Sequence, residues 1–210
     1  MGSSIRSAWL LRPYIDEKLS IETFKELEIV GIGWGSTGSC KDLTKTQLRN
    51  KLIEKYSLNG VKLGNAILCF EIFLKMKVGD LVLVPSGIDE IDIAEVSGDY
   101  YFDDDEKNTI NHKKKVSWFP ETRSRNQLSN ELRDRLKIRK LAADLSEHIE
   151  EINILSTGKP NPHIKPYEFK YVEYPLRPNL NVSIKIPNDM TEKEAMRLSR
   201  FFRDLYFDKK

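Results

Sequence analysis

A glycine-rich segment is the first candidate for chemistry in this chain. Residues 33–38 (Gly-Trp-Gly-Ser-Thr-Gly) satisfy the pattern G-x-G-x-x-G, and the apolar run at 28–34 leads into them. In a dinucleotide-binding protein these glycines open directly into a helix whose N-terminus holds the pyrophosphate. Here Ser39, Cys40 and Lys41 intervene before the next expected helix, and there is no Walker lysine. The pattern therefore argues against a nucleotide-binding loop.

Candidate catalytic and metal-ligating groups are sparse. The chain has three histidines, which are His112, His148 and His163. Their spacing fits no metal site, and two cysteines, Cys40 and Cys69, are too few for a zinc site or a disulfide framework. The triplet from Glu168 to Lys170 has the local E-x-K form of some nucleases, but patterns this short arise by chance. We expect no metal, no cofactor and no catalytic residue.

Aromatic side chains beside hydroxyls are a second kind of candidate site. Trp34 stands between two glycines that give it little local cover, so we expect its ring to be exposed. Tyr100 and Tyr101 end an expected strand, and Trp118 lies in a basic one. An exposed ring can stack on an unpaired base while hydroxyls contact the edge of that base. The alternative for each ring is packing in the core.

The charges are sorted into blocks, although the net charge is only +2. Residues 88–106 carry nine acidic residues and no Lys or Arg. The following block at 111–125 is basic through Lys113, Lys114, Lys115, Arg123 and Arg125. Such a block can bind the phosphates of a nucleic acid, or it can be an ordinary solvated face.

Hydrophobic periodicity predicts the elements that position these residues. Helices are expected at 20–27, 42–56 and 65–76, with Asp42 capping the second. Strands are expected at 5–11, 28–34, 80–85, 91–101 and 113–119. The last three strands follow one another closely, which indicates an antiparallel meander that closes a small barrel or curved sheet.

The remaining segment has a different pattern. A long amphipathic helix is expected at 129–152, followed by a Pro-rich linker at 155–166. Strands at 167–174 and 181–186 and a helix at 191–207 complete the chain. Thr191 and Glu194 have the spacing of a capping box at the start of that helix.

Composition limits the class of protein. The chain has 210 residues, 40% hydrophobic and 31% charged, with a mean hydropathy of −0.48. No apolar run approaches the ~20 residues of a membrane-spanning helix, and the first residues show no signal-peptide pattern. With two cysteines, we expect a cytoplasmic protein of one large domain or one domain with an appendage.

Several consecutive segments resemble one known family. GIGWGSTG, MKVGDLVLVPSG, IDIAEVSGDYYF and HKKKVSWF are similar to the EVE/YTH-like branch of the PUA superfamily, in the version attached to McrB-type modification-dependent restriction systems. The resemblance covers residues 4–125 and implies a curved β-barrel with a pocket for one flipped, modified base. The implied pocket residues are Trp34, Ser36, Thr37, Ser86, Tyr100, Tyr101 and Trp118. The basic residues at 113–125 would bind phosphates.

We therefore expect an α+β protein in two parts. Residues 1–125 would form an EVE/PUA-like base-reading domain, and 126–210 a long helix, a linker and a βα extension packing on it. The expected function is binding of modified DNA by base flipping, as the non-enzymatic specificity module of a restriction or antiviral defence system with a motor or nuclease partner subunit. Two alternatives remain open: a nuclease using Glu168 and Lys170, or an RNA-binding or protein-interaction module.

Overall fold

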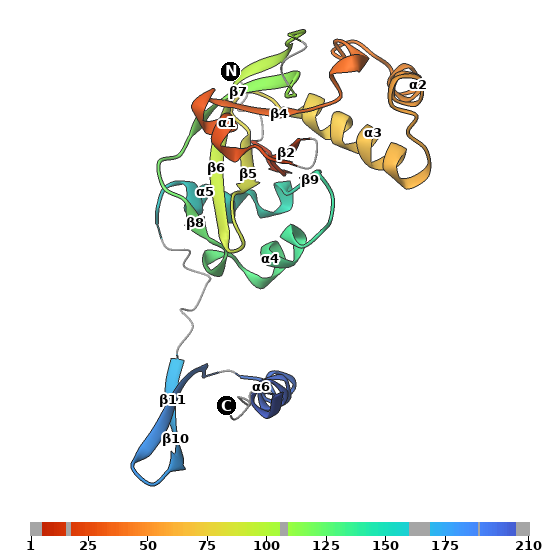
Figure 1. The fold of residues 1–210 in the computed structure, drawn as a ribbon. Helices are drawn as coiled ribbons and strands as arrows, with labels where there is room; N and C mark the ends of the chain where they lie inside the picture. The colour runs from red at the N-terminus through yellow and green to blue at the C-terminus, as the bar shows by residue number, and fades with distance from the viewer. Residues whose placement is uncertain (1–5, 16–17, 106–108, 160–168, 189, 205–210) are drawn as a thin grey trace. The chain divides into compact units, whose positions relative to one another are not determined.

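The computed structural model describes residues 6–15, 18–105, 109–159, 169–188 and 190–204 (Figure 1). The chain divides into two compact units, Met1–Ile164 and Lys165–Lys210. This division lies further along the chain than the expected boundary at residue 125. The described residues between 126 and 159 belong to the first unit because one of their strands joins its sheet.

A mixed sheet of seven strands forms the centre of the first unit. The strands are β1 (Ala8–Leu11), β4 (Ile29–Ile32), β5 (Leu81–Pro85), β6 (Glu90–Phe102), β7 (His112–Trp118), β8 (Arg123–Ser124) and β9 (Ala142–Asp144). Their order is β4-β7-β6-β5-β1-β9, and β8 pairs with β6. Strand β1 runs parallel to β5, and the other pairs are antiparallel. A separate short ribbon pairs β2 (Tyr14–Ile15) with β3 (Lys18–Leu19).

The expected meander is confirmed, since β5, β6 and β7 pair in sequence as antiparallel neighbours. Strand β6 begins paired with β5 and β8 and ends paired with β7 alone, and its register with β7 shifts between Val96 and Tyr100. Such a bulge bends a strand. The fold is α+β, but in the described residues β4 and β9 are the ends of the sheet and do not pair, so no closed barrel is found.

Both faces of the sheet are covered, which explains the continuous apolar runs in β1 and β5. Successive side chains of a strand point to opposite faces. Trp9 and Val82 therefore belong to one hydrophobic cluster, and Leu10 and Leu81 to another. Helices α1 (Ile21–Glu26), α2 (Lys45–Tyr56) and α3 (Gly60–Lys75) cover the first face, while α4 (Asn130–Leu136) and α5 (Ile149–Ser156) cover the second.

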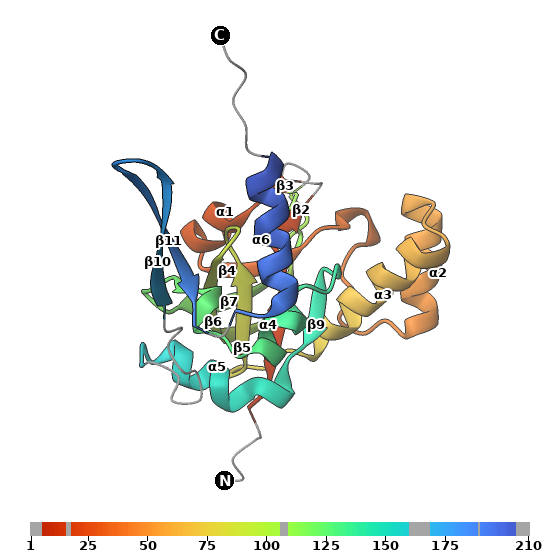
Figure 2. The ribbon, with the colours of Figure 1, turned by 90° about the horizontal axis from the view of Figure 1, so that it is seen from below.

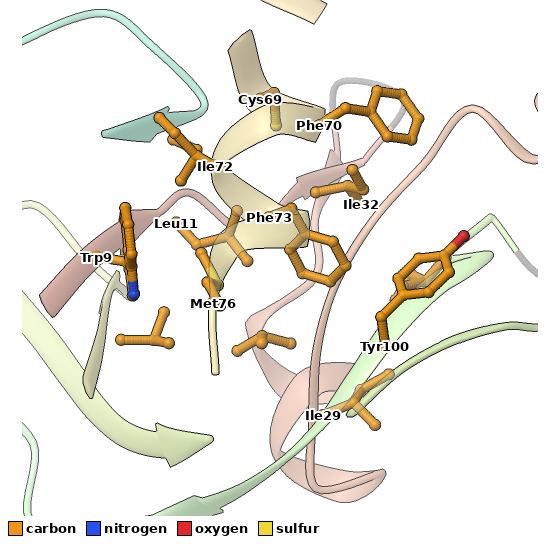
Figure 3. Close-up of a cluster of buried hydrophobic side chains, with 14 of the residues drawn as sticks. Trp9, Leu11, Ile29, Ile32, Cys69, Phe70, Ile72, Phe73, Met76 and Tyr100 are labelled. Atoms are coloured by element: carbon orange, nitrogen blue, oxygen red, sulfur yellow. The ribbon is translucent and has the colours of Figure 1, made fainter. Parts of the chain in front are cut away.

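Helix α3 contributes seven buried residues to the first face. Figure 3 shows Phe70 and Phe73 on α3 and Met76 directly after its last residue, and all three side chains are 2% exposed or less. Each such burial stabilises the fold by roughly 1.5–3 kcal/mol relative to an exposed side chain. Helix α2 lies beside α3 at one side of the sheet (Figure 2). None of the described helices combines the length and apolar character that crossing a membrane requires.

The expected cap of α2 is wrong. Thr44, not Asp42, is the N-cap: its Oγ1 accepts from Gln47 N at 3.2 Å, and its own N–H donates to Gln47 Oε1 at 2.9 Å. This capping box satisfies two backbone donors, whereas Asp42 lies too far before the first turn to reach them.

The expected long helix at 129–152 is also wrong. Helix α4 ends at Leu136, strand β9 follows, and α5 begins at Ile149. The guanidinium of Arg12 donates to the carbonyls of Leu136, Ile138 and Lys140 at 2.6, 2.9 and 3.0 Å. These bonds, with the pairing of β9 to β1, replace those that a continuous helix would make. The apolar residues at 129–152 recur at helical spacing because α4 and α5 both pack on the second face of the sheet.

The second unit contains β10 (Phe169–Arg177), β11 (Leu180–Pro187) and α6 (Glu192–Asp204). The two strands were expected, and they pair with each other as an antiparallel hairpin. The capping box is confirmed: Thr191 N donates to Glu194 Oε2 at 2.9 Å, and Glu194 N to Thr191 Oγ1 at 3.3 Å. The expected linker at 155–166 is described only up to residue 159. Its first residues form the end of α5 and the turn that follows this helix.

Candidate nucleic-acid interface

The backbone of Trp34 is the most constrained feature of the glycine-rich segment. Trp34 follows β4, has φ 66° and ψ 40°, and precedes the 3-10 turn η1 (Gly35–Thr37). This left-handed conformation is rare for a bulky residue and persists only where the surroundings enforce it. The carbonyl of Trp34 accepts from Thr37 N at 3.0 Å, Thr37 Oγ1 at 2.8 Å and His112 Nε2 at 3.3 Å. These three hydrogen bonds to one carbonyl oxygen fix the backbone conformation of Trp34, and with it the direction of the bond that carries the indole ring.

The glycines of this segment serve the turn. A Cβ added at Gly35 would collide with the side-chain amide of Asn111, and Gly38 has φ +64°. Asn111 is itself held in place, because its Nδ2 donates to the carbonyl of Asp103 at 3.0 Å. The turn therefore packs closely against Asn111, the residue directly before β7.

A buried hydrogen-bond network lies beneath the turn. The Tyr100 hydroxyl is 2.7 Å from His112 Nδ1, and Cys40 N donates to that hydroxyl at 3.0 Å. Because the Trp34 carbonyl can only accept, His112 carries its proton on Nε2 and accepts from Tyr100 on Nδ1. Burial of the fully enclosed ring lowers the pKa of His112 to about 4, so it is neutral at physiological pH.

The network separates the pocket candidates into buried and surface groups. Thr37 and Tyr100 are buried, and their hydroxyls are bonded within the protein. Trp34 is half-buried, with its ring centroid 5.4 Å from that of Phe70, and Ser36 is exposed. The structure thus brings four candidates together, of which Trp34 and Ser36 reach the surface.

The other three pocket candidates lie elsewhere. Ser86 is in the turn between β5 and β6, about 30 Å along β6 from Tyr100 at the usual rise per residue. Trp118 ends β7, packs on the first cluster and donates from Nε1 to the carbonyl of Phe24 at 3.3 Å. Tyr101 is 37% exposed and pairs with Lys113 across β6 and β7. The seven residues do not line one pocket.

The basic block at 113–125 does not form an exposed stripe. Lys113 is 5% exposed and pairs with Asp103; Lys114 is 3% exposed and donates to the carbonyl of Met76 at 2.9 Å. Burial lowers the pKa of Lys114. Arg123 is 8% exposed, donates to the carbonyl of Leu155 at 3.0 Å and pairs with Glu121.

Two members of the block reach solvent. Lys115 is exposed and donates to the carbonyl of Leu27 at 3.2 Å, while Arg125 is half-buried and donates to the carbonyl of Gly87 at 3.1 Å. Most of the block therefore stabilises the fold, because β7 and β8 lie within a sheet covered on both faces.

A different basic surface adjoins the turn, and the sequence analysis missed it. Within 41–64 the basic residues are Lys41, Lys45, Arg49, Lys51, Lys55 and Lys62, against the acidic residues Asp42 and Glu54. All six cations are exposed except Lys51, which is half-buried and donates from Nζ to the carbonyl of Thr37 at 2.6 Å. Helix α2 also contacts the turn through Tyr56, whose hydroxyl accepts from Ser36 N at 2.8 Å. We call these six residues the α2 basic surface.

The structure describes only some of the candidate catalytic and metal-ligating residues. Glu168 and His163 lie outside the described residues, and Lys170 is exposed on β10. His148 is half-buried at the start of α5, beside Glu147 at 3.5 Å. In the described part of the chain, no three His, Cys, Asp or Glu side chains gather as a metal site would require.

Comparison with known proteins identifies the family. Residues 15–142 match the family described as a domain of unknown function, DUF8426. The chain belongs to this family. The DUF8426 region includes the Trp34 turn, the α2 basic surface and β7, and it ends at the first residue of β9. No curated protein and no solved structure matches the chain.

Proposed function

We propose that the first unit is a nucleic-acid reader that stacks one unpaired or flipped-out base on Trp34. The observation that carries this proposal is the left-handed backbone of Trp34, held by three hydrogen bonds to one carbonyl. Strained residues enforced by their surroundings are concentrated at ligand sites. A ring fixed in this way loses little conformational entropy when a base stacks on it.

The α2 basic surface supports the proposal. Its six cations lie on and beside a helix that contacts the Trp34 turn, so a chain whose base stacks on Trp34 would carry its phosphates past them. An aromatic platform beside a positively charged surface is the usual arrangement for binding single-stranded nucleic acid. The exposed hydroxyl of Ser36, two residues from the ring, is positioned to contact the edge of the base.

The energetics favour a base that is already weakly paired. Stacking on one aromatic ring contributes ~1–3 kcal/mol, while flipping a base from a duplex costs a few kcal/mol. One ring and phosphate contacts therefore compensate best for a damaged, mismatched or modified base. Together with the EVE/YTH-like resemblance, this leads us to propose modified DNA as the ligand, RNA being the alternative. The reader would act in the cytoplasm as the specificity module of a restriction or defence system.

The test replaces the ring and keeps the turn. Trp34→Asn is the suitable change, because asparagine tolerates the left-handed region that Trp34 occupies. Tyr14→Ala, which removes another exposed aromatic ring, is the matched control. Binding is measured by fluorescence anisotropy with single-stranded DNA, plain and modified duplexes and RNA, and melting temperature reports folding.

We expect Trp34→Asn to weaken binding of the preferred ligand by roughly 5- to 150-fold, the equivalent of one lost base stack. Affinity for the other ligands, which depends on phosphates, should change little. A folded Trp34→Asn protein with unchanged affinity and preference would overturn the assignment of Trp34. Failure of the wild-type protein to bind any nucleic acid would overturn the proposal as a whole.

A further inference from the structure

The second unit has a sheet too small to be stable by itself. In the described residues β10 and β11 pair only with each other, and all nine residues of β10 are exposed. A two-stranded sheet is marginal in water unless further strands or a packed helix cover its apolar face. Something must therefore cover this hairpin.

One face of the hairpin is apolar. Cross-strand pairs Val172–Ile184 and Tyr174–Val182 lie on it, since alternate residues of a strand share a face. Tyr174 is 62% exposed. Helix α6 carries a second apolar stripe, with Leu198, Phe201 and Phe202 at helical spacing. The apolar face of the hairpin and the apolar stripe of α6 are each stabilised by packing against other apolar side chains.

The two edges of the hairpin differ. Strand β10 contains Pro175, which has no N–H, and its register shifts between Pro175 and Arg177. Prolines and bulges are the usual devices that block pairing at a sheet edge. Strand β11 has no proline from Leu180 to Ile186, so its outer edge offers a continuous row of backbone donors and acceptors. The open edge is β11.

We propose that β11 pairs antiparallel with β11 of a second copy of this chain, across a two-fold axis at Ser183. In this register Val182 faces Ile184 of the second copy, and Leu180 faces Ile186, so the even-numbered residues stay on the apolar face. The result is a four-stranded sheet with one apolar face, on which α6 of both copies packs.

Charge and area fit this pairing. The only charged residue of β11 is Lys185, and the proposed register places it opposite Asn181 rather than opposite its own equivalent. Phe169 and Tyr171 are exposed on the other face of the hairpin, while on its even-numbered face and on α6 the exposed large apolar side chains are Val172, Tyr174, Leu176, Leu180, Met196, Phe201 and Phe202. Together they offer on the order of 700 Å² per copy, near the ~800 Å² that each partner buries in a standard interface. The pairing does not depend on the proposed nucleic-acid function.

The test uses full-length protein and charge at the two-fold axis. Ser183 is exposed, so Ser183→Lys and Ser183→Glu should each fold, yet each places like charges opposite one another in the dimer. An equimolar mixture of the two variants places opposite charges there. Ser97→Lys, at an exposed serine of β6, is the matched control. Sedimentation equilibrium gives the mass, and circular dichroism the fold.

We expect the wild type and Ser97→Lys to sediment at twice the 24.4 kDa of one chain. Each Ser183 variant alone should dimerise roughly two- to fivefold more weakly, because like charges placed directly opposite each other destabilise a pair of strands, and the mixture should dimerise again. A wild type that stays monomeric at about 100 µM, far above the dissociation constants usual for an interface of this size, would overturn the proposal. So would Ser183 variants as dimeric as the wild type, or a mixture that stays monomeric.

Discussion

Acidification from pH 7.5 to pH 5 should destabilise the first unit through His112. The native ring is fully buried and its Nδ1 accepts from the Tyr100 hydroxyl, so the protonated form would lose that bond and be desolvated. Burial lowers the native pKa of His112 to about 4, below the 6.5 of an exposed histidine. As the pH falls through 6.5, the unfolded chain takes up a proton that the native protein does not. This contribution to stability is complete above pH 6.5 and is lost as the pH falls toward 4.

The magnitude follows from linkage. A difference of about 2.5 pKa units corresponds to roughly 3 kcal/mol in total, of which roughly 2 kcal/mol is lost between pH 7.5 and pH 5. That loss is a large part of the 5–15 kcal/mol by which domains are usually stable. Stopping at pH 5 keeps most carboxylates ionised, so His112 dominates the change.

Urea unfolding followed by tryptophan fluorescence measures this loss. The three tryptophans, Trp9, Trp34 and Trp118, all lie in the first unit, so the signal reports that unit alone. His112→Gln should be less stable at pH 7.5 but lose much less on acidification, whereas His148→Gln, at a half-buried histidine of the same unit, should lose as much as the wild type. A wild-type loss below about 0.5 kcal/mol, or an equal loss in His112→Gln, would refute the role of the buried ring.

Two further predictions test the turn and the α2 basic surface. Gly35→Ala should lower the free energy of unfolding by about 1–3 kcal/mol, because its Cβ meets the Asn111 amide. Gly64→Ala in α3, where a Cβ meets nothing within 4 Å, should raise it by about 0.5–1 kcal/mol; urea unfolding that ranks the two variants alike would contradict the close packing. The triple change Lys41→Ala, Arg49→Ala, Lys62→Ala should flatten the salt dependence of nucleic-acid affinity by about 2–3 phosphate equivalents, while Lys114→Met leaves the slope unchanged. Binding curves at several salt concentrations measure both slopes. A flatter slope for Lys114→Met and an unchanged slope for the triple variant would assign phosphate binding to the basic block at 113–125 instead.

The elements with a clear local signal could be predicted from the sequence. The meander of β5, β6 and β7, the buried helix α3 and the capping box of α6 each depend on residues close together in the chain. The break between α4 and α5 could not be predicted in the same way. It depends on Arg12, which reaches carbonyls more than 120 residues away, and the apolar spacing at 129–152 was equally compatible with one helix.

The candidate site was predictable to the extent that local geometry determines it. The two glycines around Trp34 led us to expect an exposed ring, but the structure has Trp34 half-buried against Phe70, with Ser36 exposed two residues further on. The left-handed backbone of Trp34 was not predicted. The roles of Thr37 and Tyr100 were not predictable, because their hydroxyls are bonded through His112 and the carbonyl of Trp34, which only the folded sheet brings together. His112 itself gave no signal beyond its residue type.

Burial explains why the basic block was the less informative charge cluster. A lysine on a strand covered on both faces must find a partner inside the protein, as Lys113 does with Asp103 and Lys114 with the carbonyl of Met76. Helix α2 buries only Leu48 and Leu52 fully, and its cations other than Lys51 are exposed. Lys45 pairs with Glu71 and Lys55 with Glu54, but such surface ion pairs are weak and leave the cations hydrated. In a sheet covered on both faces, an excess of positive charge on a peripheral helix is therefore stronger support for phosphate binding than the same excess on a strand.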